Sequence, residues 1–448
     1  MTTLRIIDHL DEARATLLKR RSLREVEIPA RMADSLHQLF GEPIAPAEAV
    51  RRIILSVRER GDAALREWNT RIDGASLDQL AVPEAEIDAA LGMIPAQVAS
   101  ALEFAAERIR AFHQKQPVRG WIDTQAEGSL GQLVRPIDSV GIYVAGGTAP
   151  LPSSLLMSVI PAQVAGVKEI VITTPPGRGD GRVPPVILAA AAICGAQKVI
   201  RVGGAQAIAA LAYGTASVPR VAKIVGPGNL FVTLAKQQVY GEVGIDGLPG
   251  PTETMVIADD SADPCLAAAD LLAQAEHDVL ASAILVTPSR ALAEQVAVEV
   301  ERRMERLSRA EIIAQSLADR SGAVIVRDLP EAFEVANDYA AEHLCLLIAN
   351  PWDWIGQVRN AGGVFLGESS FEVLGDYVAG PSHVMPTGGT ARSASPLNVL
   401  DFVKITSLIG LAPRAASELS EIAAILARAE ALTAHAAAAE ARMNRSER

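Results

Sequence analysis

Two pairs of residues in the second half of the chain have side chains that could hold a metal ion or move a proton. Gln274 and His277 lie three residues apart on a predicted helix, so both face one side near its carboxyl end and could ligate one metal ion. A histidine stabilised by the helix dipole is the alternative reading of His277. Glu342 and His343 follow another predicted helix. They could supply two bases in one cleft, or they could be an ordinary helix end.

Two later segments are further candidates. Asp376 to His383 reads as a polar loop after a buried strand, Gly363–Leu366, and is either a functional loop or a solvated connection. Glu430 and His435 lie in an alanine-rich terminal helix, where five residues correspond to about 500° of rotation and the side chains point roughly 140° apart. Either they contact opposite ends of one ligand, or at least one lies only at the surface.

Three glycine turns follow predicted strands in the middle of the chain. They are Ala145-Gly146-Gly147, Gly203-Gly204-Ala205-Gln206 and Gly226-Pro227-Gly228-Asn229. Glycine there lets a phosphate approach the backbone beyond the strand ends. None of them fits GxGxxG, so tight turns that need positive φ are the alternative explanation.

The elements that must position these residues alternate in type. Residues 1 to about 120 read as mainly helical, and the last fifty or so also read as helical, ending in Ser417–Met443. Between them, short β-branched runs alternate with alanine-rich helical stretches, which predicts parallel sheets covered on both faces. The alternation restarts after Gly250-Pro251. We therefore expect two doubly wound α/β halves joined near residue 250.

Composition limits the class of protein. The 448 residues are 49% apolar and 21% charged, which is typical of soluble globular proteins of two or more domains. A net charge of −12 disfavours nucleic acid and anionic membranes as partners. Three widely spaced cysteines favour a reducing cytoplasm over a disulfide framework, and no apolar run is long enough to span a membrane.

Taken together and in order, the segments resemble the histidinol dehydrogenase family over roughly residues 20–440. The resemblance depends on the glycine turns, on Gly141–Gly147, on Gly250-Pro251-Thr252-Glu253, on Gln274–His277, on Ala341–Leu344, on Gly375–His383 and on Leu432–His435. Each motif is weak alone, but the ordered set is improbable by chance.

The resemblance implies a role for each matching residue. The positions that match the family's zinc ligands are Gln274, His277, Asp376 and the partner subunit's His435, and those that match its catalytic acid/base pair are Glu342 and His343. The positions that match its NAD contacts are Tyr143, Gln206 and Asn229. The positions that match its substrate site are Thr252, His383 and Glu430, together with His343 and the metal ligands.

The resemblance also implies a fold and a reaction. It implies two incomplete Rossmann-like domains with helical extensions exchanged between the subunits of a homodimer. The expected boundaries are 1–37 for an N-terminal helical extension, 38–142 plus 252–396 for the metal and acid/base domain, 143–251 for the NAD-binding domain and 397–448 for the C-terminal helical extension. The implied reaction is oxidation of L-histidinol through L-histidinaldehyde to L-histidine with two NAD and one zinc per subunit, at the end of histidine biosynthesis.

Some residues depart from the family pattern. Thr252 stands where Ser is usual, Ile405 stands where Arg is usual, and Gly247-Leu248-Pro249 also differs. The added methyl of Thr252 could crowd an imidazole-bearing substrate. One alternative is therefore a related zinc/NAD dehydrogenase of another polar alcohol, such as sulfopropanediol. A non-catalytic binding protein on the same fold is a second alternative.

Overall fold

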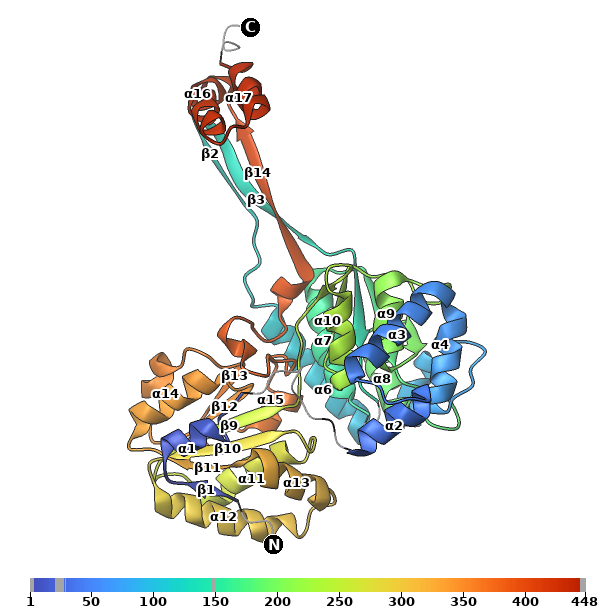
Figure 1. The fold of residues 1–448 in the computed structure, drawn as a ribbon, viewed down its shortest axis with the longest axis vertical. Coiled ribbons are helices and arrows are strands. Elements are labelled where there is room, and N and C mark those ends of the chain that lie inside the picture. Colours follow the sequence, from blue (N-terminus) through green and yellow to red (C-terminus); the bar gives the residue numbers. More distant parts are fainter. Residues whose placement is uncertain (1–3, 21–27, 29, 147–149, 444–448) are drawn as a thin grey trace. The chain divides into compact units, whose positions relative to one another are not determined.

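The computed structural model describes residues 4–20, 28, 30–146 and 150–443 (Figure 1). Gly147 of the first predicted glycine turn lies outside these residues. The chain divides into two compact units. Unit 1 is Met1–Lys115 with Asp138–Asp401, and unit 2 is Gln116–Ile137 with Phe402–Arg448.

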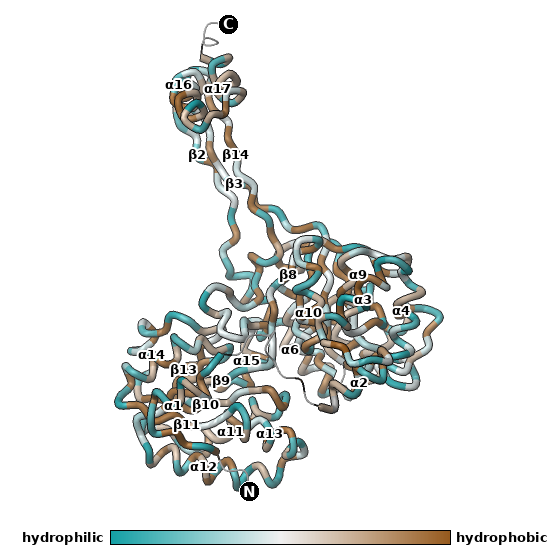
Figure 2. Tube along the Cα trace, viewed as in Figure 1, coloured by the Kyte–Doolittle hydropathy of each residue, from teal (hydrophilic) through white to brown (hydrophobic). Residues whose placement is uncertain are grey.

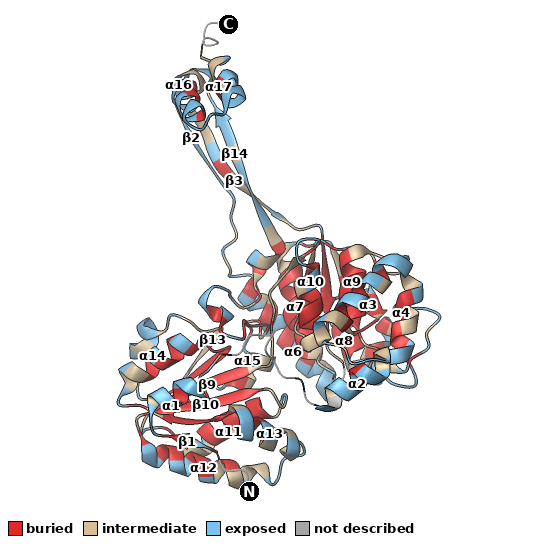
Figure 3. Cartoon of the chain, viewed as in Figure 1, coloured by how far each residue is buried: buried red, intermediate tan, exposed pale blue. Residues whose placement is uncertain are grey.

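Unit 1 contains a six-stranded parallel sheet of order β1-β11-β10-β9-β12-β13. Its strands are β1 (Ile6–Ile7), β9 (Glu253–Ala258), β10 (Ser282–Thr287), β11 (Gly322–Ile325), β12 (His343–Leu347) and β13 (Gly363–Leu366). Every residue of β9, β10 and β12 is buried, as expected for a parallel sheet covered on both faces. Figure 2 shows the hydropathy of these strands, and Figure 3 shows their burial.

Helices cover both faces of this sheet. One apolar cluster joins it to α11 (Pro264–Ala275), α12 (Arg290–Met304) and α13 (Ala310–Arg320), and a second joins it to α1 (Leu10–Ala15) and α14 (Leu329–Tyr339). Helix α11 begins where its sequence predicts. Asp263 caps it by accepting from the Cys265 amide, and Pro264 occupies the first turn.

Unit 1 also contains a five-stranded parallel sheet of order β6-β5-β4-β7-β8. Its strands are β4 (Ser139–Tyr143), β5 (Glu169–Thr174), β6 (Val199–Arg201), β7 (Lys223–Val225) and β8 (Gly244–Ile245), and its helices are α7 (Pro152–Ala165), α8 (Pro185–Ile193), α9 (Gly204–Tyr213) and α10 (Leu230–Val239). Strand order reverses between β4 and β7 here, and between β9 and β12 in the other sheet. The expectation of two doubly wound α/β halves is confirmed.

The early helices contradict part of the expected domain division. All but one of the buried residues of α3 (Pro46–Arg60) and α4 (Asp62–Trp68) belong to the apolar cluster of α9, α10 and the five-stranded sheet. They therefore do not pack on the half that contains 252–396, as the expected domain of 38–142 plus 252–396 requires. The expected extension 1–37 contributes β1 to the six-stranded sheet before α2 (Ala30–Phe40) begins. Helical periodicity shows that a helix has a buried face, but not which sheet that face meets.

Four more helical elements precede β2. In chain order they are the π-helical turn η1 (Asn69–Asp73), α5 (Glu84–Ala89), the 3₁₀ turn η2 (Ala90–Met93) and α6 (Ala96–His113). No single helix in the part of the chain described has the length and apolarity of a membrane span. Glu84–Met93 and Ala96–His113 reach that limit only as a pair, bent by 113°.

Unit 2 combines a three-stranded antiparallel sheet with two helices. The sheet has the order β14-β3-β2, from β2 (Trp121–Gln125), β3 (Gly128–Pro136) and β14 (Val403–Leu411), and the helices are α16 (Pro413–Ala429) and α17 (Thr433–Glu440). The expectation of a wholly helical segment 397–448 is wrong at β14. All of β2 is exposed, and most of β14 is too (Figure 3). A strand exposed on both faces lacks the apolar alternation by which strands are recognised in a sequence.

Candidate active site

An acid/base cluster lies at the amino edge of the six-stranded sheet. Glu342 immediately precedes β12, His343 begins it, and Thr252 immediately precedes the neighbouring β9. The Thr252 hydroxyl donates to Glu342 Oε2 over 2.6 Å, and the Glu253 amide donates to the same oxygen over 3.1 Å. His343 Nδ1 lies 3.7 Å from that oxygen and 3.4 Å from the Glu253 carbonyl oxygen. The predicted pair therefore shares one buried site, although ligands in open α/β sheets usually bind at the carboxyl edge.

Helix α15 (Glu372–Tyr377) supplies two more carboxylates to this cluster. Asp376 Oδ1 lies 3.6 Å from His343 Nε2, and Glu372 Oε1 lies 4.0 Å from His343 Nδ1. Glu372 is fully buried and accepts from the Thr254 hydroxyl over 2.6 Å. Asp376 thus lies in a short helix rather than in the expected loop. The sequence interpretation missed Glu372, although its position four residues before Asp376 places both on one helical face.

Burial and mutual charge set the protonation of the cluster. Burial alone would lower the pKa of His343, but the carboxylates of Glu372, Glu342 and Asp376 outweigh it and raise the pKa to about 10. Burial raises the pKa of Glu342 and that of Glu372 to about 7 each, partly opposed by His343. Burial also acts on Asp376, but its interactions with His343 prevail and lower its pKa. Three carboxylates around one imidazole make a site that attracts cations.

The metal candidates of α11 lie beside this cluster. Gln274 is fully buried, and its amide nitrogen is turned towards Glu372. In this orientation the nitrogen donates to Glu372 Oε1 over 2.6 Å, and the carbonyl oxygen of the side chain accepts from the Glu253 amide over 3.0 Å. His277 lies just beyond the helix, is exposed, and interacts electrostatically with Asp376. An imidazole and a carboxylate are donor types that suit zinc, and an amide oxygen is a less common zinc ligand.

The described residues contain no group of three His, Cys, Asp or Glu side chains arranged to hold a metal ion. Three of the four predicted ligands, Gln274, His277 and Asp376, belong to unit 1. Only two of these three, His277 and Asp376, are among the residue types His, Cys, Asp and Glu. His435 lies in α17 of unit 2 and is exposed, as is Glu430. The predicted ligand set is therefore divided between the two units.

His383 connects the acid/base cluster to the five-stranded sheet. Its Nδ1 lies 2.8 Å from the Asp376 carbonyl oxygen, and its Nε2 lies 3.0 Å from the Ser154 hydroxyl. Ser154 is buried in the first turn of α7, which begins beyond the carboxyl end of β4. The neighbouring Ser382 hydroxyl donates to the Met157 carbonyl oxygen over 3.1 Å. Ser154 carries no sequence signal and was missed.

The carboxyl edge of the five-stranded sheet carries the predicted dinucleotide contacts. The hydroxyl of Tyr143, the last residue of β4, accepts from the Gly204 amide over 3.2 Å. Gln206 is fully buried in the first turn of α9, and neither of its side-chain polar atoms has a hydrogen-bond partner. The Thr174 hydroxyl at the end of β5 is likewise buried and unpartnered, and this residue was not predicted. These atoms and the helix amino termini fit a polar ligand with phosphates.

Asn229 and the third glycine turn complete this edge. Asn229 caps α10 by accepting from the amides of Phe231 and Val232, so its side-chain oxygen has a structural role. Gly226 has φ of +111°, and a Cβ there would lie 2.2 Å from the Tyr143 carbonyl oxygen. The turn is fixed by buried Lys236, which donates to the Gly226 carbonyl oxygen over 3.0 Å and pairs with Asp246.

Asp73, near Tyr143, gives a pH-dependent prediction. Burial raises the pKa of Asp73 to about 6, partly opposed by Arg178, and its Oδ2 has no hydrogen-bond partner. Because the folded pKa lies above the unfolded one, the charged carboxylate destabilises the fold above about pH 6, and this cost disappears below the ordinary aspartate range. Asp73→Asn should therefore raise the free energy of unfolding by about 1–2 kcal/mol at pH 8.

The measurement is denaturant unfolding at pH 8 and pH 4. Exposed Asp78→Asn is the matched control and should change little at either pH. A gain from Asp73→Asn that is equal at both values would show that charge burial is not its cause.

Comparison with known proteins agrees with this arrangement. The family model described as histidinol dehydrogenase matches residues 43–443. The chain is 53% identical over 434 residues to the histidinol dehydrogenase of Deinococcus radiodurans, covering 96% of this chain and 98% of that protein. It is 52% identical over 389 residues to that of Thermus thermophilus, covering 87% of this chain and 92% of that protein.

The chain belongs to the histidinol dehydrogenase family. The crystal structure of histidinol dehydrogenase from Elizabethkingia anophelis superposes with a TM-score of 0.89 at 33% identity, covering 98% of both chains. The predicted resemblance, the mixed α/β fold and the assignment as a dehydrogenase are confirmed. Membership of this family therefore favours an enzyme over the alternative of a non-catalytic binding protein.

Proposed function

We propose that this protein oxidises L-histidinol through L-histidinaldehyde to L-histidine, using NAD and zinc, in cytoplasmic histidine biosynthesis. The observation that supports it most directly is the buried cluster of His343 with Glu342, Glu372 and Asp376. His383 links this cluster to the sheet edge where Gln206 has unpartnered polar atoms. The proposed proton-transfer site and the proposed NAD site therefore both belong to unit 1.

The proposed roles follow from these contacts. His343 takes the proton of the substrate hydroxyl at Nε2, which is buried without a hydrogen-bond partner. Because the surrounding carboxylates raise the pKa of His343 to about 10, the imidazole must release its own proton before it can act as this base. A cation held by Asp376 would cancel part of that negative charge and lower this pKa. Glu342 accepts a proton from the water that adds to the aldehyde, and a pKa of about 7 suits that exchange. Thr252 and the Glu253 amide hold the Glu342 carboxylate in place. Overall, alcohol, water and two NAD⁺ give carboxylate, two NADH and three protons.

The bound groups would be held by residues already named. Zinc would be held by Gln274, His277, Asp376 and the partner subunit's His435, and when bound it orients the imidazole and amine of the substrate. NAD would contact Tyr143, Gln206 and Asn229, and when bound it accepts a hydride in each oxidation.

The charge of the site favours a cationic alcohol over a sulfonated one. Glu342, Glu372 and Asp376 surround His343, and Glu430 is the proposed partner of the substrate amine. Such a site repels a sulfonate and attracts the amine of histidinol. Thr252 keeps the hydroxyl that holds Glu342, so its extra methyl leaves that hydrogen bond intact.

The test is NADH formation by the zinc-loaded protein with L-histidinol, counted against the histidine released. We expect two NADH per histidine, with activity lost to a chelator and restored by zinc. One NADH per turnover with released aldehyde would contradict the two-step proposal. No NADH with L-histidinol, but formation with sulfopropanediol, would support the related dehydrogenase instead.

We further propose a homodimer in which unit 2 completes the partner's site, exchanging its terminal helices. Unit 2 exposes many large apolar side chains, among them Ile405 and Ile409 of β14 and Leu419, Ile422, Ile425 and Leu426 of α16. The side chains that α16 buries are small instead: Ala415, Ser420, Ala424 and Ala427. Apolar surface of this extent is typical of a protein–protein contact. A second copy is the proposed occupant because His435 and Glu430 belong to the same unit.

Mixed dimers test this arrangement. His343→Ala and His435→Ala should each be inactive alone. If His435 acts in the partner's site, a mixed dimer has one site with both defects and one intact site, so random mixing should restore about a quarter of wild-type activity. No recovery from verified mixed dimers would show that His435 serves its own subunit.

A further inference from the structure

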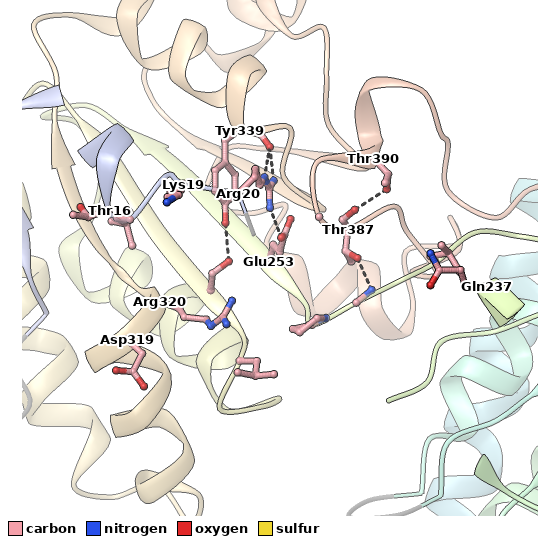
Figure 4. Close-up of a pocket in the computed structure, with 17 residues that line it drawn as sticks. Thr16, Lys19, Arg20, Gln237, Glu253, Asp319, Arg320, Tyr339, Thr387 and Thr390 are labelled. Atoms are coloured by element: carbon pink, nitrogen blue, oxygen red, sulfur yellow. Dashed lines mark hydrogen bonds and ion pairs between the residues drawn. The ribbon is translucent and has the colours of Figure 1, made fainter. Parts of the chain in front are cut away.

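Arg20 contacts both chain segments that lead into the acid/base cluster (Figure 4). Its Nη1 forms an ion pair with Glu253 Oε1. Its Nε donates to the Tyr339 carbonyl oxygen over 3.0 Å, and its Nη2 donates to the same oxygen and to the Ala340 carbonyl oxygen, the latter over 3.2 Å. The guanidinium carbon lies 3.6 Å from the centroid of the Tyr339 ring. One planar cation thus binds β9 and the end of α14 together.

Each of these partners is next to a residue of the cluster. The Glu253 backbone donates to Glu342 through its amide and faces His343 Nδ1 through its carbonyl oxygen. Its side chain points to the opposite side of the strand from those of Thr252 and Thr254, because successive residues of a strand alternate. Arg20 therefore acts on a strand residue whose backbone holds both Glu342 and His343.

The second contact lies at a strained position. Ala340 has φ of +53°, in the left-handed region that is strained for a non-glycine residue. This conformation turns the chain from α14 towards Glu342, two residues later. Arg20 binds the carbonyl groups on either side of the Tyr339–Ala340 connection. Without them, the turn would lose the contacts that favour it over relaxed alternatives.

We infer that Arg20 is a positioning residue for the acid/base pair, holding the distance between the Thr252–Glu253 segment and Glu342–His343. It does not touch the reacting atoms. The inference rests on the proposed function only for the roles of Glu342 and His343.

A cavity of about 320 Å³ beside this contact makes a direct test possible. Arg20, Glu253 and Tyr339 are among its lining residues, and Glu253 Oε2 is buried with no hydrogen-bond partner (Figure 4). Truncation of Arg20 would enlarge the cavity where its guanidinium lay. Free guanidinium can then reach the Glu253 carboxylate and the Tyr339 carbonyl oxygen.

The experiment compares Arg20→Ala, Arg20→Lys and wild type as zinc-loaded enzymes. We expect Arg20→Ala to lower kcat about 100-fold with little change in KM, zinc content or NAD affinity. Low millimolar guanidinium should restore part of kcat, whereas equal urea or sodium chloride should not. Arg20→Lys should fall between, because an ammonium can pair with Glu253 but cannot also bind both carbonyl groups.

The matched control is Arg14→Ala. Arg14 lies in α1, six residues before Arg20, and pairs with Asp338 of α14, but this pair is exposed, with 3.8 Å between its atoms. It should change neither kcat nor KM. If Arg20→Ala does not fold, Glu253→Gln replaces it, and an unchanged kcat in that variant would overturn the proposal.

Two results with a folded Arg20→Ala would also overturn it: kcat close to wild type, or a loss that guanidinium does not reverse. Failure of the proposed function is seen separately, as wild-type inactivity with L-histidinol. The ratio of variant to wild type would then be measured with the alcohol that the wild type oxidises.

Discussion

His343→Ala is expected to lower kcat about 10³-fold while the protein keeps its zinc. His343 is the imidazole at the centre of the cluster, and its unpartnered Nε2 is the atom placed to take the substrate proton. Its side chain is not among the proposed zinc ligands. Loss of this imidazole should therefore slow proton transfer without removing the metal.

The measurement combines kcat with L-histidinol, zinc content of the purified dimer and NAD affinity by calorimetry. His9→Ala is the matched control, because His9 is an exposed histidine at the start of α1 and should retain full activity and zinc. Zinc loss in His343→Ala would contradict the assigned role. So would turnover close to that of the wild type.

Glu342→Gln is expected to slow oxidation of the aldehyde about 10²-fold and oxidation of the alcohol much less. The amide is nearly isosteric and can still accept the Thr252 and Glu253 hydrogen bonds, so the local structure should persist. It cannot take a proton from the water that adds to the aldehyde. The two oxidations should therefore separate kinetically.

Single-turnover experiments started from L-histidinol and from L-histidinaldehyde measure the two steps. Thr252→Ser is the matched control, since it keeps the hydroxyl that donates to Glu342 and should change neither step strongly. Equal losses in both steps of Glu342→Gln would contradict the division of roles between Glu342 and His343.

Much of the site could be anticipated from local patterns. Glu342 and His343 are adjacent in the sequence at a helix-to-strand boundary, so their proximity required no knowledge of the fold. The order of the motifs along the chain is by itself sufficient to predict the family. Glu372 and Ser154 were missed because each joins the site through contacts with residues distant in sequence.

The expected fold differs from the structure in two places. The resemblance implies that residues 38–142 belong with 252–396, but α3 and α4 pack on the five-stranded sheet. Their apolar faces would fit either sheet, so helical periodicity does not decide between the two. Strand β14 lies in a segment that the sequence predicts to be helical, because its exposed faces carry no burial pattern and its pairing partner β3 lies more than 250 residues earlier.

The sequence by itself determined the alternating α/β architecture and the family, and it was sufficient to predict Glu342 and His343 as the acid/base pair. These depend on periodicities and motifs within short windows, where each residue restricts its neighbours directly. Tertiary structure alone decided that the cluster forms at the amino edge of β9 and β12. It also brought Arg20 and Glu253 together, since contacts between residues 233 positions apart arise only when packing brings separate segments to one place.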